Sequence, residues 1–167
     1  MRLSNLISSV HSEHKNIKVN NICFNSKGVK KDDIFFAIPG TKINGEKFIN
    51  EAINKGASAV VCRKKFKDKL KYKNFIQVED VRKTLSEACS NYYKKKPKNL
   101  LAVTGTNGKT SVAHFFNQML KYNRVNAASI GTLGVQSKKF NQSTNLTTID
   151  PLLLHKILEK LKNKKIN

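Results

Sequence analysis

The residues of this sequence best suited to phosphate chemistry are Thr104–Thr110, which read Thr-Gly-Thr-Asn-Gly-Lys-Thr. A glycine-rich turn between a strand and a helix aims backbone N–H groups and the positive end of the helix dipole at one point, where a phosphate chain can bind. We expect Lys109 to place its ammonium group on the β- and γ-phosphates of such a chain, and the Thr110 hydroxyl to bind Mg²⁺. The predicted phosphate-binding residues are Gly105, Thr106, Asn107, Gly108, Lys109 and Thr110.

The pattern departs from the strict G-x-x-x-x-G-K-[ST] motif, because Val103 stands at the position of its first glycine. The alternative interpretation is a tight turn whose glycines serve packing only. The elements on either side favour phosphate binding, since an apolar run that predicts a buried strand, Leu100–Val103, precedes the turn and a helical pattern follows it. That pattern comprises Val112, Phe115, Phe116, Met119 and Leu120.

Two more elements are predicted after this helix. Residues 125–130 favour a second strand. Asp150 and Pro151 are typical of a helix start, with the proline at the first helical position. The apolar face of this last helix would comprise Leu154, Ile157, Leu158 and Leu161.

The first half of the chain alternates strand and helix patterns, which predicts the α/β class. The spacing predicts a helix over 46–55 that ends at Gly56, and a helix that begins after a capping residue, Asp80. The lysine-proline stretch 94–97 is the expected domain boundary. Strands are predicted over 22–24, 34–38, 57–62 and 75–78.

The charge of the chain is strongly positive, with 32 Lys+Arg against 11 Asp+Glu and a net charge of +21. Only Arg2, Arg63, Arg82 and Arg124 are arginine, the residue whose planar fork best recognises phosphates and base edges. Lysine is accompanied by an excess of Asn and Ile, residues that share A/T-rich codons, so a compositionally biased genome is the favoured explanation for the charge. Weak, salt-sensitive attraction to polyanions is expected whatever the function, and specific nucleic-acid binding is the less favoured alternative. No apolar run is long enough to cross a bilayer and no secretory signal is seen, so a cytoplasmic protein without membrane insertion is expected.

Two separate groups of motifs resemble the Mur ligases, ATP-dependent enzymes that form amide bonds in peptidoglycan precursor synthesis. The string Thr104–Thr110 resembles the phosphate loop of that family. Asn25-Ser26-Lys27, Asp33–Ala37, Asn44-Gly45 and Gly56–Ala59 resemble its N-terminal UDP-binding domain. Residues 130–134 and 146–151 resemble the branch that adds the third residue of the peptide.

The resemblance implies a small N-terminal α/β UDP-binding domain over 1–97, followed over 98–167 by the first part of the central P-loop domain, with the C-terminal ligase domain absent. It implies ATP and Mg²⁺ as cofactors and UDP-MurNAc-L-Ala-D-Glu as the substrate. The family reaction forms an acyl phosphate, which the amine of diaminopimelate or lysine then attacks.

The resemblance also suggests which residues bind the UDP-sugar substrate. Thr147 and Thr148 would contact the muramoyl-peptide part. The family's usual Asp-Ser-Arg is Asn25-Ser26-Lys27 here, and Lys27 cannot reproduce a bidentate arginine contact. From the residues alone, Ser26 could equally be an ordinary turn residue. On the uridine and pyrophosphate side the implied residues are Phe24, Ser26, Thr41, Lys42 and Ile43.

The catalytic residues are not expected within this chain. Between Thr110 and Ile149 the sequence has no Asp or Glu, so no carboxylate of that stretch can complete a metal shell. His114 and His155 are interpreted as ordinary helix residues. In the family the remaining metal ligands lie beyond the point that corresponds to Asn167. The chain alone is therefore expected to be inactive, and a binding module without turnover, or a truncated gene product, is the alternative to a ligase.

Overall fold

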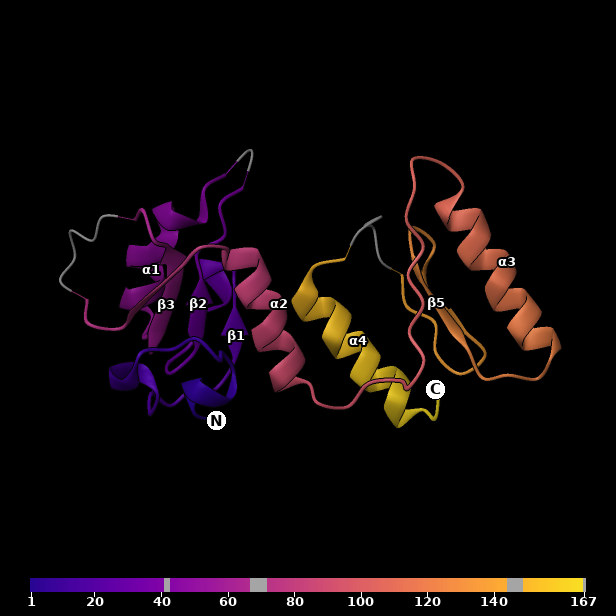
Figure 1. Ribbon diagram of the computed structural model, residues 1–167, viewed down its shortest axis with the longest axis horizontal. Helices are drawn as coiled ribbons and strands as arrows, with labels where there is room; N and C mark the ends of the chain where they lie inside the picture. The colour runs from indigo at the N-terminus through magenta and orange to yellow at the C-terminus, as the bar shows by residue number, and fades with distance from the viewer. Residues whose placement is uncertain (41–42, 67–71, 144–148, 167) are drawn as a thin grey trace. The chain divides into compact units, whose positions relative to one another are not determined.

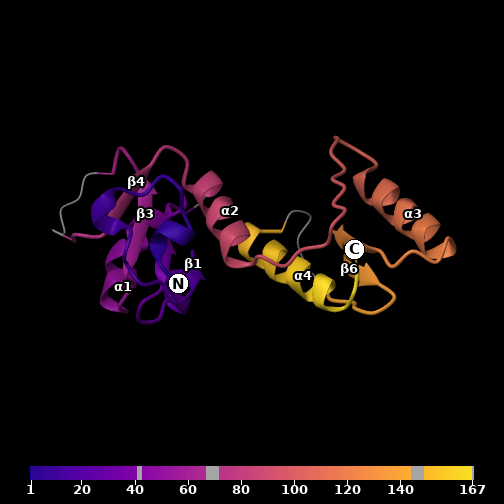
Figure 2. The same cartoon turned by 60° about the horizontal axis from the view of Figure 1, so that its bottom comes forward.

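The computed structural model describes residues 1–40, 43–66, 72–143 and 149–166. The chain divides into two compact units, Met1–Tyr92 and Tyr93–Asn167, which Figures 1 and 2 draw in indigo and magenta and in orange and yellow. No helix in the described part of the chain has the length and apolar character needed to cross a membrane.

The first unit contains a parallel sheet of four strands: β1 (Ile22–Cys23), β2 (Ile34–Phe36), β3 (Ala59–Arg63) and β4 (Phe75–Val78). They lie in the order β1-β2-β3-β4 and all neighbours are parallel, with Phe35 paired to Cys23 on one side and to Val60 on the other. The predicted α/β class is confirmed, and so is each of the four predicted strands, within a few residues at its ends.

Helices and loops cover both faces of this sheet. Successive strand side chains point to opposite faces, and Ile34, Phe35 and Phe36 are all buried. On the face of Phe35 and Val60 the core includes Ile49 and Ala52 of helix α1 (Ile49–Asn54). The sequence predicted one helix over 46–55, whereas residues 45–48 form a 3₁₀ turn before α1.

Helix α2 (Val81–Tyr92) begins as predicted, because the Asp80 carboxylate accepts hydrogen bonds from the backbone N–H groups of Arg82 (2.8 Å) and Lys83 (3.0 Å). It is joined to the N-terminal segment, since Asn91 Nδ2 donates to the carbonyl oxygen of Leu6 at 2.9 Å. The buried residues of α2 are Val81, Thr84, Leu85, Ala88 and Cys89.

The second unit contains helix α3 (Lys109–Tyr122), a hairpin of β5 (Ala128–Gly131) and β6 (Gly134–Ser137), and helix α4 (Pro151–Asn163). The start of α4 is as predicted, because the Asp150 carboxylate accepts a hydrogen bond from Leu153 N at 2.9 Å. Strand β6 was not predicted from the sequence. The core of this unit comprises Val135, Ile157, Leu161 and Ile166, with partly buried residues of β5 beside them.

The predicted strand at Leu100–Val103 is wrong. This segment has irregular backbone, and its apolar side chains are exposed, Leu101 by 76%. A strand is stabilised by hydrogen bonds to a neighbouring strand, and no described residue pairs with this segment. The apolar face of α3 was predicted correctly as a pattern, but Val112, Phe115, Phe116 and Met119 are exposed too.

Candidate functional site

The glycine-rich loop leads directly into α3. Gly108 is the N-cap residue of the helix and has φ of 76° and ψ of −7°, in the left-handed region that side chains rarely adopt. No described heavy atom lies within 4 Å of where a Cβ at Gly108 would be, so the backbone conformation rather than crowding calls for glycine. The first helical hydrogen bond runs from Val112 N to the carbonyl oxygen of Gly108 at 2.9 Å.

The backbone geometry at the start of α3 is therefore suited to binding an anion. The N–H groups of Lys109, Thr110 and Ser111 precede that first hydrogen bond and have no intrahelical acceptor. Gly108 has no side chain with which to cap them. These donors coincide with the positive end of the helix dipole, so a phosphate group at this end would receive several hydrogen bonds at once.

Lys109 bends back over its own loop. Its Nζ donates to the carbonyl oxygens of Gly105 and Thr106, the latter at 2.9 Å. Lys109 is half-buried, whereas Gly105, Thr106, Asn107, Gly108 and Thr110 are exposed. The ammonium group is thus held at the loop by acceptors that phosphate oxygens could replace.

The candidate ligand for Mg²⁺ that the loop motif predicts is the Thr110 hydroxyl, which is exposed. Among the described residues no group of three His, Cys, Asp or Glu side chains could hold a metal ion. Mg²⁺ commonly keeps several waters and binds substrate phosphates, so a single hydroxyl is compatible with it. Of the two histidines of this unit, His114 contacts Gln118 through Nε2 at 2.7 Å. Burial, with a smaller effect of Lys96, lowers the pKa of His155.

In the first unit the described residues among those predicted to bind substrate follow two neighbouring strands of the sheet. Half-buried Phe24 and buried Ser26 follow β1, and Ile43, which is 64% exposed, lies in the chain after β2. The carboxyl ends of parallel strands share an edge, where ligands of open α/β sheets bind. Thr41 and Lys42, and in the second unit Thr147 and Thr148, lie outside the described residues.

The side chain of Ser26 has a partner within the protein. Its Oγ donates to Glu51 Oε2 at 2.7 Å, and Lys55 Nζ donates both to Glu51 Oε1 (2.7 Å) and to the carbonyl oxygen of Ser26 (3.1 Å). The hydrogen bonds from Lys55 and then Ser26 lower the pKa of Glu51. The hydroxyl proton of Ser26 is therefore used in the hydrogen bond to Glu51, and only its oxygen can accept a further hydrogen bond.

An ion pair near the same edge was not found from the sequence. Arg63, at the end of β3, forms a two-point contact with Glu46, with Nε to Oε1 at 2.9 Å and Nη2 to Oε2 at 2.7 Å. The hydrogen bond from Arg63 lowers the pKa of Glu46. Nothing in the spacing of these two residues predicts their contact, which the sheet creates.

Cys23, the last residue of β1, has a thiol near this edge. Burial and the neighbouring Asp33 carboxylate raise the pKa of its thiol to about 12. The thiol is therefore neutral at ordinary pH and unsuited to act as a nucleophile.

Comparison with known proteins identifies the class. Residues 18–93 match the Mur ligase family, catalytic domain, and residues 103–167 match the Mur ligase middle domain. The chain belongs to the Mur ligase family.

Similar curated proteins are UDP-N-acetylmuramoyl-L-alanyl-D-glutamate--2,6-diaminopimelate ligases. The protein of Rickettsia prowazekii (strain Madrid E) is 42% identical over 151 residues, which are 88% of this chain and 31% of the relative. That of Rhizobium meliloti (strain 1021) is 37% identical over 156 residues, 93% of this chain and 32% of the relative. The chain thus spans about a third of the length of these relatives.

Two solved structures are also similar. A UDP-N-acetylmuramoyl-L-alanyl-D-glutamate--2,6-diaminopimelate ligase has a TM-score of 0.77 at 23% identity, covering 99% of this chain and 34% of that one, a likeness of fold. The MurF ligase from Thermotoga maritima in complex with ADP has a TM-score of 0.50 at 26% identity, covering 68% of this chain and 26% of that one.

Proposed function

We propose that this chain carries the ATP-binding and UDP-substrate-binding part of a MurE-type ligase, which adds the third amino acid to UDP-MurNAc-L-Ala-D-Glu through an acyl phosphate. The observation that carries the proposal is the loop Thr104–Thr110 at an uncapped helix start, in a chain 42% identical to a diaminopimelate ligase. The names of the relatives favour diaminopimelate over lysine as the added amino acid. Use of ATP favours the cytoplasm as the compartment.

In the proposed ATP site, the backbone of Gly105–Gly108 and the first turn of α3 hold the phosphates. Lys109 exchanges its two carbonyl partners for oxygens of the β- and γ-phosphates, which offsets their charge. Thr110 would supply one oxygen to Mg²⁺, whose role when bound is to neutralise the transferring phosphoryl group. That a similar ligase was solved in complex with ADP supports nucleotide binding by this chain.

Each of the two parts of the chain has its own proposed substrate-binding residues. Within 1–97, Phe24, Ser26 and the Thr41–Ile43 turn would bind the uridine and pyrophosphate. Within 98–167, Thr147 and Thr148 would bind the muramoyl peptide. Hydroxyl groups and loop amides are neutral donors suited to a diphosphate, and the oxygen of Ser26 can still accept a hydrogen bond from the uracil or ribose.

ATP affinity tests the nucleotide site directly. We expect Lys109→Ala to weaken ATP binding by about a hundredfold in calorimetry, because charge-assisted hydrogen bonds to two phosphates are lost. Lys98→Ala removes the same charge from an exposed residue of the same unit, and it should change the affinity by less than about threefold. Equal affinities of the wild-type and Lys109→Ala chains would contradict the proposed ATP site.

Turnover tests whether this chain alone is a ligase, against the alternative that it is a binding module for UDP-muramoyl peptide or nucleotide without catalysis. The alternative is favoured by the lack of Asp and Glu between Thr110 and Ile149. The purified chain is mixed with ATP, Mg²⁺ and UDP-MurNAc-L-Ala-D-Glu, and phosphate release is measured with and without diaminopimelate. Release that depends on diaminopimelate and is lost in Lys109→Ala supports a ligase in its own right. ATP binding without release agrees with the expected inactivity of this chain alone.

A further inference from the structure

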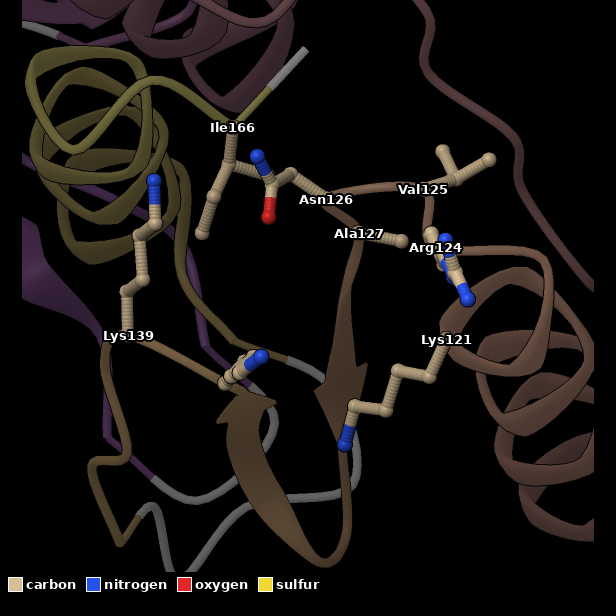
Figure 3. Close-up of a pocket in the computed structure, with 8 residues that line it drawn as sticks. Lys121, Arg124, Val125, Asn126, Ala127, Lys139 and Ile166 are labelled. Atoms are coloured by element: carbon tan, nitrogen blue, oxygen red, sulfur yellow. The ribbon is translucent and has the colours of Figure 1, made fainter.

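A cavity of about 450 Å³ lies in the second unit, away from the glycine-rich loop. Four of the side chains that line it are cationic: Lys121, Arg124, Lys138 and Lys139. Figure 3 shows Lys121 and Arg124 on the side of α3, with Lys139 across the cavity and Ile166 between them. Helix α3 has 14 residues at about 1.5 Å each, so the cavity and the loop are separated by about 20 Å along this helix.

These four cations are not neutralised within the described part of the chain. None of them forms an ion pair with a described carboxylate. Asp150 and Glu159 are the only acidic residues in the sequence from Tyr93 to Asn167. Cations of like sign brought together at one cavity repel one another, and an anion between them would relieve that repulsion.

Arg124 is held in this position at a cost in backbone conformation. It follows α3 with φ of 59°, in the left-handed region. Its N–H donates to the carbonyl oxygen of Lys121 (3.0 Å), and Val125 N donates to that of Leu120 (2.9 Å). This is the Schellman arrangement, in which the left-handed position is usually glycine. An arginine there is unfavourable for the backbone, and such strain is characteristic of functional positions.

The end of α4 repeats the arrangement. Lys165 has φ of 60°, its N–H donates to the carbonyl oxygen of Lys162 (2.9 Å), and Ile166 N donates to that of Leu161 (3.1 Å). Val125 and Ile166, the residues after the two left-handed positions, both line the cavity. Cations at helix ends also offset the helix dipoles, but two dipole ends amount to about −1 charge against four positive side chains. A net charge of about +3 therefore remains.

We propose that this cavity binds a compact anion that carries a chain of two or more phosphate groups, separately from the ATP site at Thr104–Thr110. Lysines would contact single phosphate oxygens, and the guanidinium of Arg124 would contact two oxygens at once. A volume of about 450 Å³ is in the range of small-molecule sites, and the apolar walls of Val125 and Ile166 leave room for an organic group beside the phosphates.

Inorganic tripolyphosphate is the probe for this site. Calorimetry is done with the full chain carrying Lys109→Ala, which disables the glycine-rich loop, at about 50 mM salt so that charges are little screened. In this background Lys138→Gln/Lys139→Gln should weaken binding by about tenfold or more. Lys94→Gln/Lys95→Gln removes the same charge from exposed residues outside the cavity and should change the affinity by less than about threefold. Equal losses in the two double variants, or no binding to the Lys109→Ala chain, would overturn the proposal.

The variant Arg124→Gly separates a loss of tripolyphosphate binding from a loss of folding. Glycine relieves the left-handed strain, so the Tm in thermal denaturation should stay the same or rise, while tripolyphosphate binding weakens by about tenfold. Unchanged binding in this variant would overturn the role of Arg124. A short single-stranded oligothymidine is titrated in parallel. If it binds more tightly than tripolyphosphate and loses affinity in Lys138→Gln/Lys139→Gln, the surface serves nucleic acid and the compact ligand is excluded.

Discussion

The Glu46–Arg63 pair shows how one contact near the substrate edge responds to pH. Because Arg63 lowers the pKa of Glu46 in the folded chain, the pair stabilises the fold fully above the ordinary carboxyl value of 4.5 and loses this contribution as the pH falls through the lowered pKa. We expect Glu46→Gln to reduce the free energy of unfolding by about 1 kcal/mol at pH 7, a charge-assisted bond discounted for solvent screening. In urea unfolding the difference from wild type should shrink at pH 3.

Glu79→Gln is the matched control, because the Glu79–Lys64 pair leaves both side chains largely exposed, by 80% and 60%. It should cost less than about 0.5 kcal/mol. A cost for Glu46→Gln no larger than this would show that the two-point geometry adds nothing to stability.

At the residue scale, the sequence predicts local features such as helix caps better than it predicts contacts between residues far apart in the chain. The helix starts at Asp80 and Asp150 depend on neighbours within a few residues, and the spacing revealed them. The partner of Ser26 is Glu51, 25 positions away. No local pattern contains that contact, because the sheet brings the two segments together.

The turn that leads from β2 into the 3₁₀ segment before α1 depends on close backbone contact. A Cβ at Gly45 would lie 2.7 Å from both the N and the O of Ile38, whose carbonyl accepts a hydrogen bond from Gly45 N. We expect Gly45→Ala to lower the free energy of unfolding by about 1–3 kcal/mol, as overpacking does elsewhere. Gly28→Ala is the control, since a Cβ there has no described atom within 4 Å, and thermal denaturation of both variants checks this. Equal Tm values for Gly45→Ala and Gly28→Ala would show that the backbone of Ile38 shifts to make room for the Cβ.

At the element scale, predictions succeeded where an element contains its own stabilising pattern. Helices α2, α3 and α4 have a periodic apolar face, two of them with a side-chain cap, and all three were found. Strands depend on partners. The apolar run Leu100–Val103 has the composition of a buried strand without a described neighbour, whereas β6 has a weaker pattern but pairs with β5.

Across the whole chain, the helices differ in how many of their side chains are buried. Helix α3 buries only Asn117, whose Nδ2 donates to Gln136 O at 3.2 Å, whereas α4, one residue shorter, buries Ile157, Leu158 and Leu161. Helices of this length are marginal without tertiary packing. In hydrogen exchange by mass spectrometry, we expect amides of α3 to exchange at least about tenfold faster than those of α4. Equal protection would show that the exposed face of α3 is covered in solution.

Periodicity predicted which residues of α3 share a face, but not whether anything covers that face. Coverage belongs to the whole molecule, and the chain spans about a third of the relatives it matches. The charge shows the same limit. The sequence gives the net charge of +21 directly, but only the structure shows that the turns after α3 and β6 bring four cations to one cavity.

The order of the strands in the first unit also bears on how the protein is made. Because β1, β2, β3 and β4 lie side by side in the order of the sequence, each strand that leaves the ribosome finds its partner already synthesised. The sheet can therefore grow at one edge during translation, without waiting for a later segment to be inserted between earlier ones. Helix α2 is made last and meets an N-terminal segment that was made first, so its docking completes this unit.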